Sequence, residues 1–190
     1  MVTLDYKNSP HNKDGIKLIW MDGGLTPTIP EQVKEEFIMN FDAGNSSGIM
    51  MIGNKGVITS EIYANNPTLY VKGEDPVVFS TRNQPNVNNV HASTWTEACK
   101  AGFDSRKHKE LTSSFDYSGP FTETVIMGNL ALRSRDLRNI VSTNSNGRQK
   151  LDYYGRKKLL WDGENMKITN LDEANSYVSK TYRKGWELPI

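Results

Sequence analysis

Three histidines are the first residues to consider for chemistry, and they are scattered in polar surroundings: His11, His91 and His108. None has a second histidine or cysteine two or four residues further along the chain. We therefore expect no metal site, since zinc needs several such ligands. His91 differs because it lies in NNVHASTW, just ahead of an expected helix, where a loop side chain can point into a cleft. A histidine on the surface is the alternative.

Three carboxylates, Asp22, Asp116 and Asp162, lie near an aromatic residue and a glycine. This setting suits a sugar, whose hydroxyls bond to the carboxylate while its apolar face stacks on a ring. Trp20 and Tyr117 supply such rings beside Asp22 and Asp116. Turn chemistry explains Asp22-Gly23 and Asp162-Gly163 equally well, and Asp116 and Tyr117 can also serve a turn and the packing.

Other catalytic patterns are missing. The chain has no GxGxxG after a strand, no GxxxxGK[ST], no HExxH and no GxSxG. Gly53 and Gly56 lie between two strand-like runs, so they predict a hairpin turn and no phosphate-binding loop. The single cysteine, Cys99, excludes an internal disulfide, and its helical spacing from other apolar residues predicts a buried thiol. A nucleophilic role for it is the alternative.

The composition is typical of a soluble globular protein. The 190 residues are 36% hydrophobic and 24% charged, and this length suits one large domain with one core. A formal net charge of +1 gives no reason to expect nucleic acid, and the basic tracts RSRDLR and GRKK predict solvated surface. We expect no membrane partner, because no apolar run approaches the roughly 20 residues that cross a bilayer.

Alternating apolar residues predict the strands that would carry these side chains. Residues 2–6 and 16–20 form one expected hairpin, and GIMMIGNKGVITSEIY forms another. Brief strands follow near 69–71 and 77–79, and later in KLLWD and MKIT. Residues 134–157 look like an insertion or extended loop.

Three helices are expected in the second half of the chain. Thr94 and Glu97 form a capping box for the first, which Gly102 ends, and Pro120 opens the second. The second is apolar on more than one stripe, which predicts cover on both sides. Asn170 and Glu173 box the third. With strands early and helices late, the predicted class is α+β, with a mostly antiparallel open-faced sheet covered by helices on one face.

Six strings, in order, carry a resemblance: KLIWMDGGLTP, GIMMIGNKGVI, HASTWTEACKAG, SSFDYSGPFTETVIMGNLALRS, KLLWDGENMKITN and ANSYVSKTYRKGWEL. Together they resemble the bacterial-type carboxy-terminal domain of the Gfo/Idh/MocA oxidoreductases over nearly the whole chain. The most specific pieces are FDYSGPFTETVIMGNLALR and YRKGWEL. By this resemblance, residues 1–190 are a single substrate and oligomerisation domain.

The resemblance implies a two-part enzyme that transfers hydride between NAD or NADP and a carbinol carbon of a sugar, cyclitol or glycoside. An amino-terminal Rossmann domain would bind the cofactor. The EKP-like lysine and the GCHxxD-like histidine of such enzymes do not occur here. We therefore expect no catalytic or cofactor-binding residue in this chain, and no activity from it alone. The true amino terminus is expected upstream, so the location, cytoplasmic or periplasmic, stays undecided.

Within that frame the expected substrate-binding residues are His91, Asp116, Tyr117, Trp20 and Asp22. We expect His91 and the pair Asp116-Tyr117 to line one cleft. A stand-alone carbohydrate-binding or scaffold module without redox activity is the alternative, and an unrelated α+β interaction protein is a third.

The resemblance also implies a homo-oligomer that forms through the open face of the sheet. The apolar residues expected on that face are Ile19, Met21, Met50 and Ile52. An apolar face without a helix over it needs another cover. The alternative is that these residues pack under the Asn-rich connections.

Overall fold

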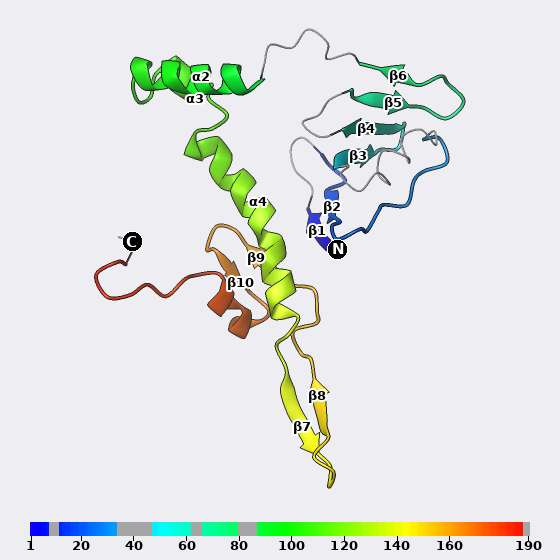
Figure 1. Ribbon diagram of the computed structural model, residues 1–190, viewed down its shortest axis with the longest axis vertical. Helices are drawn as coiled ribbons and strands as arrows, with labels where there is room; N and C mark the ends of the chain where they lie inside the picture. The colour runs from blue at the N-terminus through cyan, green and yellow to red at the C-terminus, as the bar shows by residue number, and fades with distance from the viewer. Residues whose placement is uncertain (8–11, 34–46, 62–65, 80–86, 188–190) are drawn as a thin grey trace. The chain divides into compact units, whose positions relative to one another are not determined.

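The computed structural model describes residues 1–7, 12–33, 47–61, 66–79 and 87–187. The chain is α+β, and its paired strands are antiparallel, which confirms the predicted class (Figure 1). It divides into two compact units, one with Met1 and Trp20–Leu111, the other with Val2–Ile19 and Thr112–Ile190. Each has its own cluster of buried apolar residues, where the composition had suggested one core.

The first unit contains a four-stranded sheet in the order β3-β4-β5-β6. Its strands are β3 (Gly48–Ile52), β4 (Val57–Glu61), β5 (Thr68–Tyr70) and β6 (Val77–Val78). The predicted hairpin between β3 and β4 is confirmed, with the Gly53 amide donating to the Gly56 carbonyl at 2.9 Å. Position 56 needs glycine, because a Cβ there would lie 2.6 Å from the carbonyl oxygen of Tyr70.

One face of this sheet is covered and the other is open. On the covered face Val57 and Tyr70 are buried against Val33, and Ile29 and Met50 pack around them. Among the described residues, this cover comes from the segment before β3 and not from a helix. The register places five apolar residues on the opposite face: Ile49, Met51, Ile58, Leu69 and Val77.

The open apolar face therefore differs from the one expected. Met50 faces the core, and Ile52 shares its side of β3, although Ile52 is 64% exposed at the strand end. The prediction chose the wrong side of β3, because this strand is apolar on both sides and alternation alone cannot orient it. Ile19 lies in β2 (Ile16–Trp20) and Met21 follows it, outside this sheet.

Two helices follow in the same unit, α2 (Val87–Ala101) and the single turn α3 (Arg106–Lys109). The predicted capping box is wrong. Helix α2 begins seven residues before Thr94, whose hydroxyl bonds back to the carbonyls of Val90 and His91. The predicted stop is confirmed, since Gly102 follows the helix with φ +88°. Cys99 is exposed, which corrects the expected buried thiol.

The second unit is built on α4 (Phe115–Ser134), which contacts β1 (Val2–Tyr6). Strand β1 pairs with β2, as predicted, and turns alternate residues toward the interior. Gly128 of α4 faces Val2 of β1, since a Cβ there would be in ordinary van der Waals contact with the Val2 side chain at 3.5 Å. Pro120 lies inside α4 and does not open it, which corrects the predicted start.

The carboxy-terminal end of α4 carries the core of this unit. Ile168, Leu171 and Ala174 are buried there, and Leu130 of α4 packs against them. They come from the hairpin of β9 (Trp161–Asp162) with β10 (Lys167–Ile168) and from the 3-10 helix η2 (Asp172–Tyr177). Four apolar side chains elsewhere on α4 are exposed, so the expected cover on both sides is not found: Phe121, Val125, Ile126 and Leu132.

The third predicted helix is the short η2, and its predicted capping box is wrong. Leu171, and not Asn170, occupies the N-cap. Asn170 instead bonds to the backbone of Leu160 and Lys158. Leu171 and Ala174 are buried, and the half-buried Val178 packs against them.

The segment 134–157, expected to be an insertion or extended loop, contains a regular hairpin of β7 (Asn139–Thr143) and β8 (Gln149–Asp152). Asn144 shapes its turn, since Oδ1 accepts from the amides of Asn146 and Arg148. Gly147 completes the turn with φ +77°. None of the described helices is long and apolar enough to cross a membrane.

Candidate functional site

Trp20 and Asp22 form one candidate surface at the end of β2. The indole of Trp20 is 57% exposed. Asp22 Oδ1 accepts the amide of Gly23 at 2.7 Å, and Gly23 and Gly24 have φ of +68° and +83°. The turn role weighed for Asp22 is therefore real, while Oδ2 accepts no hydrogen bond from a described residue. An exposed ring two residues from a carboxylate can stack on a sugar and accept its hydroxyls.

Asp116 and Tyr117 form the second candidate surface, within the first turn of α4. They were expected in a loop ahead of this helix, and the position is corrected because the helix begins at Phe115. Both are exposed, and Tyr117 presents 59% of its surface to solvent. The Asp116 carboxylate lies in the first turn of α4 and bonds to no described residue.

Two phenylalanines extend this second surface. Phe115 is 93% exposed and Phe121 is 63% exposed, beside Tyr117 in sequence. A soluble monomer rarely exposes neighbouring aromatic side chains of this size without a use for them. The first two turns of α4 thus offer aromatic rings, one phenol hydroxyl and one carboxylate, which is a set that can bind a sugar.

His91 lies in the second turn of α2, not ahead of a helix. The argument that placed it in a loop is therefore wrong. Its side chain is exposed, and its carbonyl accepts from Thr94 at 2.9 Å. Exposure leaves it free to contact a ligand, while the surface role weighed for it agrees equally well with this position.

The candidate residues are divided between the two units of the chain. Trp20, Asp22 and His91 belong to the first unit, whereas Asp116 and Tyr117 belong to the second. The expected common cleft of His91 with Asp116 and Tyr117 therefore stays a prediction. Among the described residues, no group of three or more His, Cys, Asp or Glu side chains could hold a metal ion.

Asp162 has a structural role in the turn between β9 and β10. Its Oδ2 accepts from Asn165 Nδ2 at 2.8 Å, and its Oδ1 accepts the Asn165 amide at 3.1 Å. The hydrogen bond from the Asn165 side chain, then that from its amide, lowers the pKa of Asp162. Both oxygens are engaged within the turn, which supports the turn role over sugar binding.

The β9–β10 hairpin is attached to α4 by a contact that the sequence analysis did not predict. The indole Nε1 of Trp161 donates to Glu123 Oε1 at 2.6 Å, and both side chains are half-buried. Gly163 lies against the same carboxylate, since a Cβ there would be 3.0 Å from Glu123 Oε1. The two partners are 38 residues apart, so no local pattern signals the pair.

Comparison of the chain with family models, curated proteins and solved structures gives no match. The fold and sites define the class as an α+β protein with antiparallel sheets and two exposed aromatic-carboxylate surfaces.

Proposed function

We propose that this chain is the substrate-side and oligomerisation domain of an NAD(P)-dependent oxidoreductase of the Gfo/Idh/MocA type. Its substrate would be a sugar, a cyclitol or a glycoside. The observation that carries the proposal is the order of the six resembling strings. The most specific of them, FDYSGPFTETVIMGNLALR, coincides with one continuous helix, α4.

The exposed surfaces support the substrate class. Tyr117 would stack on the apolar face of the sugar ring and bond to a hydroxyl, and Asp116 would accept hydroxyl hydrogen bonds. Trp20 with Asp22 offers the same chemistry on the first unit. His91 would donate to a ring or glycosidic oxygen from the surface of α2.

The residues of this chain do not fit a dinucleotide. Its one Gly-x-x-Gly, from Gly53 to Gly56, closes a hairpin, whereas a pyrophosphate binds where such a turn opens a helix. The cofactor is therefore assigned to a Rossmann domain outside this chain. That domain would supply the hydride chemistry, and this chain would bind and orient the substrate.

The gene provides the simplest test. The proposal expects a GxGxxG-bearing domain encoded about two hundred residues ahead of these residues, which is the size of a Rossmann domain with its connections. If the upstream sequence encodes no nucleotide-binding domain, the enzyme proposal fails.

Kinetics on the complete gene product tests the site. Tyr117→Phe removes one hydroxyl and is expected to lower kcat/KM about fivefold, the effect of losing a hydrogen bond of about 1 kcal/mol. Tyr182→Phe, at another exposed tyrosine, is the matched control and should leave kcat/KM unchanged. If Tyr117→Phe and His91→Ala both stay within about twofold of the wild type, these residues do not bind substrate.

The second candidate is a stand-alone carbohydrate-binding module, favoured by the free oxygen of Asp22 beside the exposed indole of Trp20. Calorimetry on the chain alone separates the two candidates. Saccharide binding that Trp20→Ala abolishes, in a protein encoded without a nucleotide-binding domain, would establish the module. Micromolar binding of NAD(H) or NADP(H) by the chain alone would contradict both.

We also propose that a second copy of this chain covers the open face of the four-stranded sheet, defined by Ile49, Met51, Ile58, Leu69 and Val77. This face spans all four strands, and Met51 is 60% exposed. Covering an apolar sheet face is favourable by about 25 cal/mol for each Å² removed from water. The oligomer would bury this side of the sheet, in place of the residues predicted from the sequence.

A further inference from the structure

The segment 134–157, here called the basic arm, concentrates positive charge. It contains six basic residues, Arg135, Arg138, Arg148, Lys150, Arg156 and Lys157, and two acidic ones, Asp136 and Asp152. Its formal charge is thus +4, while the whole chain carries +1, so the rest of the chain carries −3. Such asymmetry within one chain indicates an attraction for anions that is confined to the arm.

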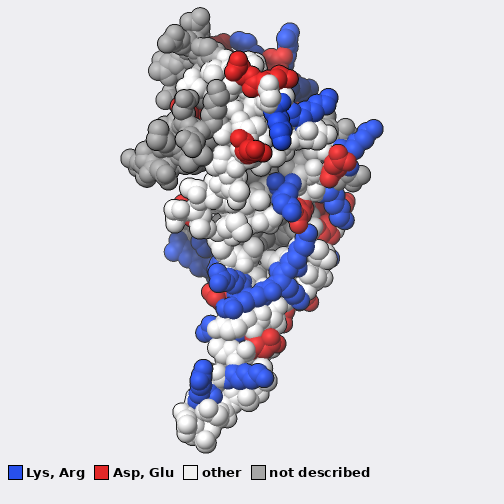
Figure 2. Space-filling model, turned by 90° about the vertical axis from the view of Figure 1, so that its right-hand side faces the viewer, with Lys and Arg blue, Asp and Glu red and all other residues white. Residues whose placement is uncertain are grey.

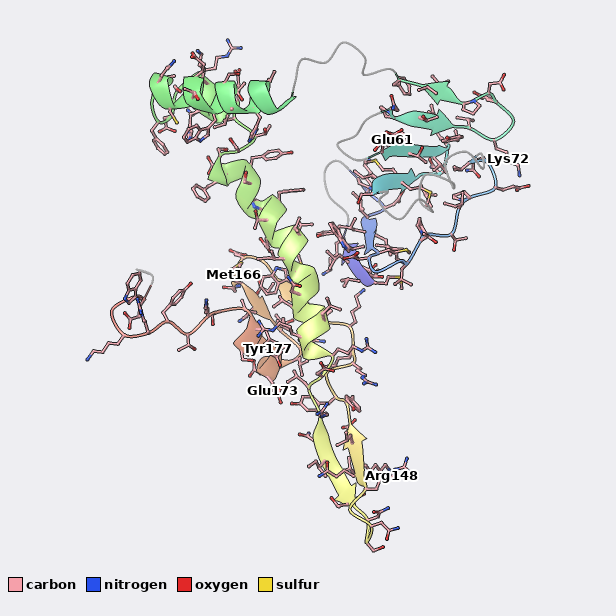
Figure 3. All side chains as sticks on the ribbon, in the orientation of Figure 1. Glu61, Lys72, Arg148, Met166, Glu173 and Tyr177 are labelled. Atoms are coloured by element: carbon pink, nitrogen blue, oxygen red, sulfur yellow. The ribbon has the colours of Figure 1, made fainter. Side chains whose placement is uncertain are left out.

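The arm presents these charges on an exposed two-stranded ribbon. All residues of β7 are exposed, and in β8 only Leu151 is partly buried. Arg148 lies between the turn and β8, and Lys150 lies within β8, so two basic residues stand close together in sequence at the turn end of the ribbon. Figure 2 shows lysine and arginine side chains at the end of the molecule where Figure 1 places β7 and β8, and Figure 3 shows Arg148 extending from the ribbon near the turn.

At the base of the ribbon two arginines are held over one ring. The guanidinium of Arg156 lies 3.7 Å from the centroid of Tyr153, and that of Arg138 lies 5.7 Å from it. At an exposed site such a cation–π contact modestly favours the observed position of each arginine. The two guanidinium groups gather positive charge around Tyr153, and this charge attracts an anion.

The cations of the arm are not neutralised by the described part of the chain. The ion pairs formed by described residues leave out all six basic side chains of the arm. By contrast, Lys158, just beyond the arm, pairs with Asp5 at 2.5 Å.

We propose that the basic arm binds an anionic polysaccharide, a chain of sugars that bears a carboxylate on each unit. Arg138 and Arg156 bind one carboxylate as a pair, and Arg148 and Lys150 bind others toward the turn. Asn139, Asn144 and Asn146 supply amides for the hydroxyls between the charges. This binding is independent of the redox function proposed above, because it rests on the charges of the arm alone.

Nucleic acid fits the arm less well. Duplex DNA carries a charge about every 1.7 Å. The −3 of the remaining chain would repel such a dense polyanion. Single-stranded nucleic acid binds by stacking its bases on free aromatic side chains. Tyr153 carries the two guanidinium groups, and Tyr154 packs into the core of its unit.

The test uses polygalacturonate oligomers labelled for fluorescence anisotropy. We expect the charged oligomer to bind and the fully methyl-esterified oligomer, which has the same backbone without charge, to bind at least tenfold more weakly. Raising the salt concentration should weaken the binding of the charged oligomer. The variant R138Q/R156Q should lose at least tenfold in affinity, whereas the control K55Q/K109Q, with the same loss of charge outside the arm, should keep wild-type affinity.

Three outcomes overturn the proposal. The first is no binding of the charged oligomer at low salt. The second is an equal loss in both double variants, which would mean a response to net charge alone. The third is tighter binding to a 20-base-pair DNA duplex than to polygalacturonate, which would assign the arm to nucleic acid. Matching thermal melting curves of both variants and the wild type show that an effect on binding is not unfolding.

Discussion

The indole Nε1 of Trp161 donates a hydrogen bond of 2.6 Å to Oε1 of Glu123. This bond connects the β9–β10 turn with the middle of α4, across 38 residues of sequence. A half-buried carboxylate that loses its donor keeps the cost of its desolvation. The pair therefore holds the most specific resembling helix against the WDGEN turn, and it can be broken from either side.

Trp161→Phe should destabilise the protein by at least about 2 kcal/mol, since it removes the Nε1 donor and replaces the indole with a smaller ring. Glu123→Gln keeps an acceptor oxygen and should cost less, about 1 kcal/mol. Urea unfolding of both variants and of the double variant measures the coupling. Additive effects in the double variant would show that the two side chains do not stabilise each other.

The side chain of Asn175 pairs with the backbone of Ile168 in the way that a neighbouring strand would, and we expect it to be important for stability. Its Oδ1 accepts the amide of Ile168 at 2.7 Å and its Nδ2 donates to the carbonyl of Ile168 at 3.0 Å. Asn175→Ala leaves both backbone groups unpaired beside the buried Ile168 side chain and should cost about 2 to 3 kcal/mol in urea unfolding. Asn175→Asp is the matched variant, which keeps the acceptor and loses the donor. A wild-type midpoint for Asn175→Ala would mean that water replaces both bonds.

Among the described glycines, we expect Gly155→Ala to lower the stability of the fold most. The added Cβ would lie 1.9 Å from the carbonyl oxygen of Ser134 and 2.8 Å from Leu137 Cβ. The backbone of Ser134, at the end of α4, cannot move away easily, and Gly155 itself is buried. The free energy of unfolding should therefore fall by at least about 3 kcal/mol. Gly119→Ala is the control, because nothing lies within 4 Å of its Cβ and alanine favours the helix by about 1 kcal/mol. Opposite shifts in thermal melting are expected.

Long-range contacts explain where sequence patterns stopped being informative. The alternation in β1 and the Gly53–Gly56 hairpin were predictable, because both depend on neighbours in sequence. The box of Thr94 with Glu97 had the right spacing, yet Thr94 bonds back within α2 and Glu97 pairs with Lys100 and Lys107. A capping pattern inside a helix looks the same as one at its start.

The candidate site was predictable only as residue types. Local composition left two roles open for each of Tyr117 and Asp22. The structure shows that the ring of Tyr117 is exposed and that Asp22 accepts the amide of Gly23 within a turn. The Trp161–Glu123 bond and the arginines over Tyr153 depend on how distant segments fold together, and no spacing in the sequence encodes them. The open face of the sheet was assigned to the wrong side because β3 carries Met50 and Met51 on opposite sides.

The ion pair of Asp5 with Lys158 predicts a stability change at acid pH. The hydrogen bond from Lys158 lowers the pKa of Asp5. A lowered carboxylate pKa stabilises the fold above the unfolded-state value, about 3.9, and this contribution disappears as the pH falls through the lower folded-state value. Asp5→Asn should therefore melt slightly below the wild type at pH 7, and the two melting temperatures should converge as the pH falls below the lowered pKa of Asp5. A constant difference across this range would exclude the ion pair as its cause.

The open sheet face provides the prediction for self-association. Met51→Glu places a charge on the apolar face, in the edge strand β3, where burial in an interface would remove it from water at a cost of several kcal/mol. We expect sedimentation of the wild type to show a species heavier than the 21.5 kDa monomer. In the variant, the dissociation constant of this species should be at least tenfold higher, so that more of the protein is monomeric. Met166→Glu is the control, since Met166 is also exposed, at 52%, but lies in the β9–β10 turn. A wild type that stays monomeric at high concentration, or an equal effect of both substitutions, would show that the face formed by Ile49, Met51, Ile58, Leu69 and Val77 is not the contact between copies.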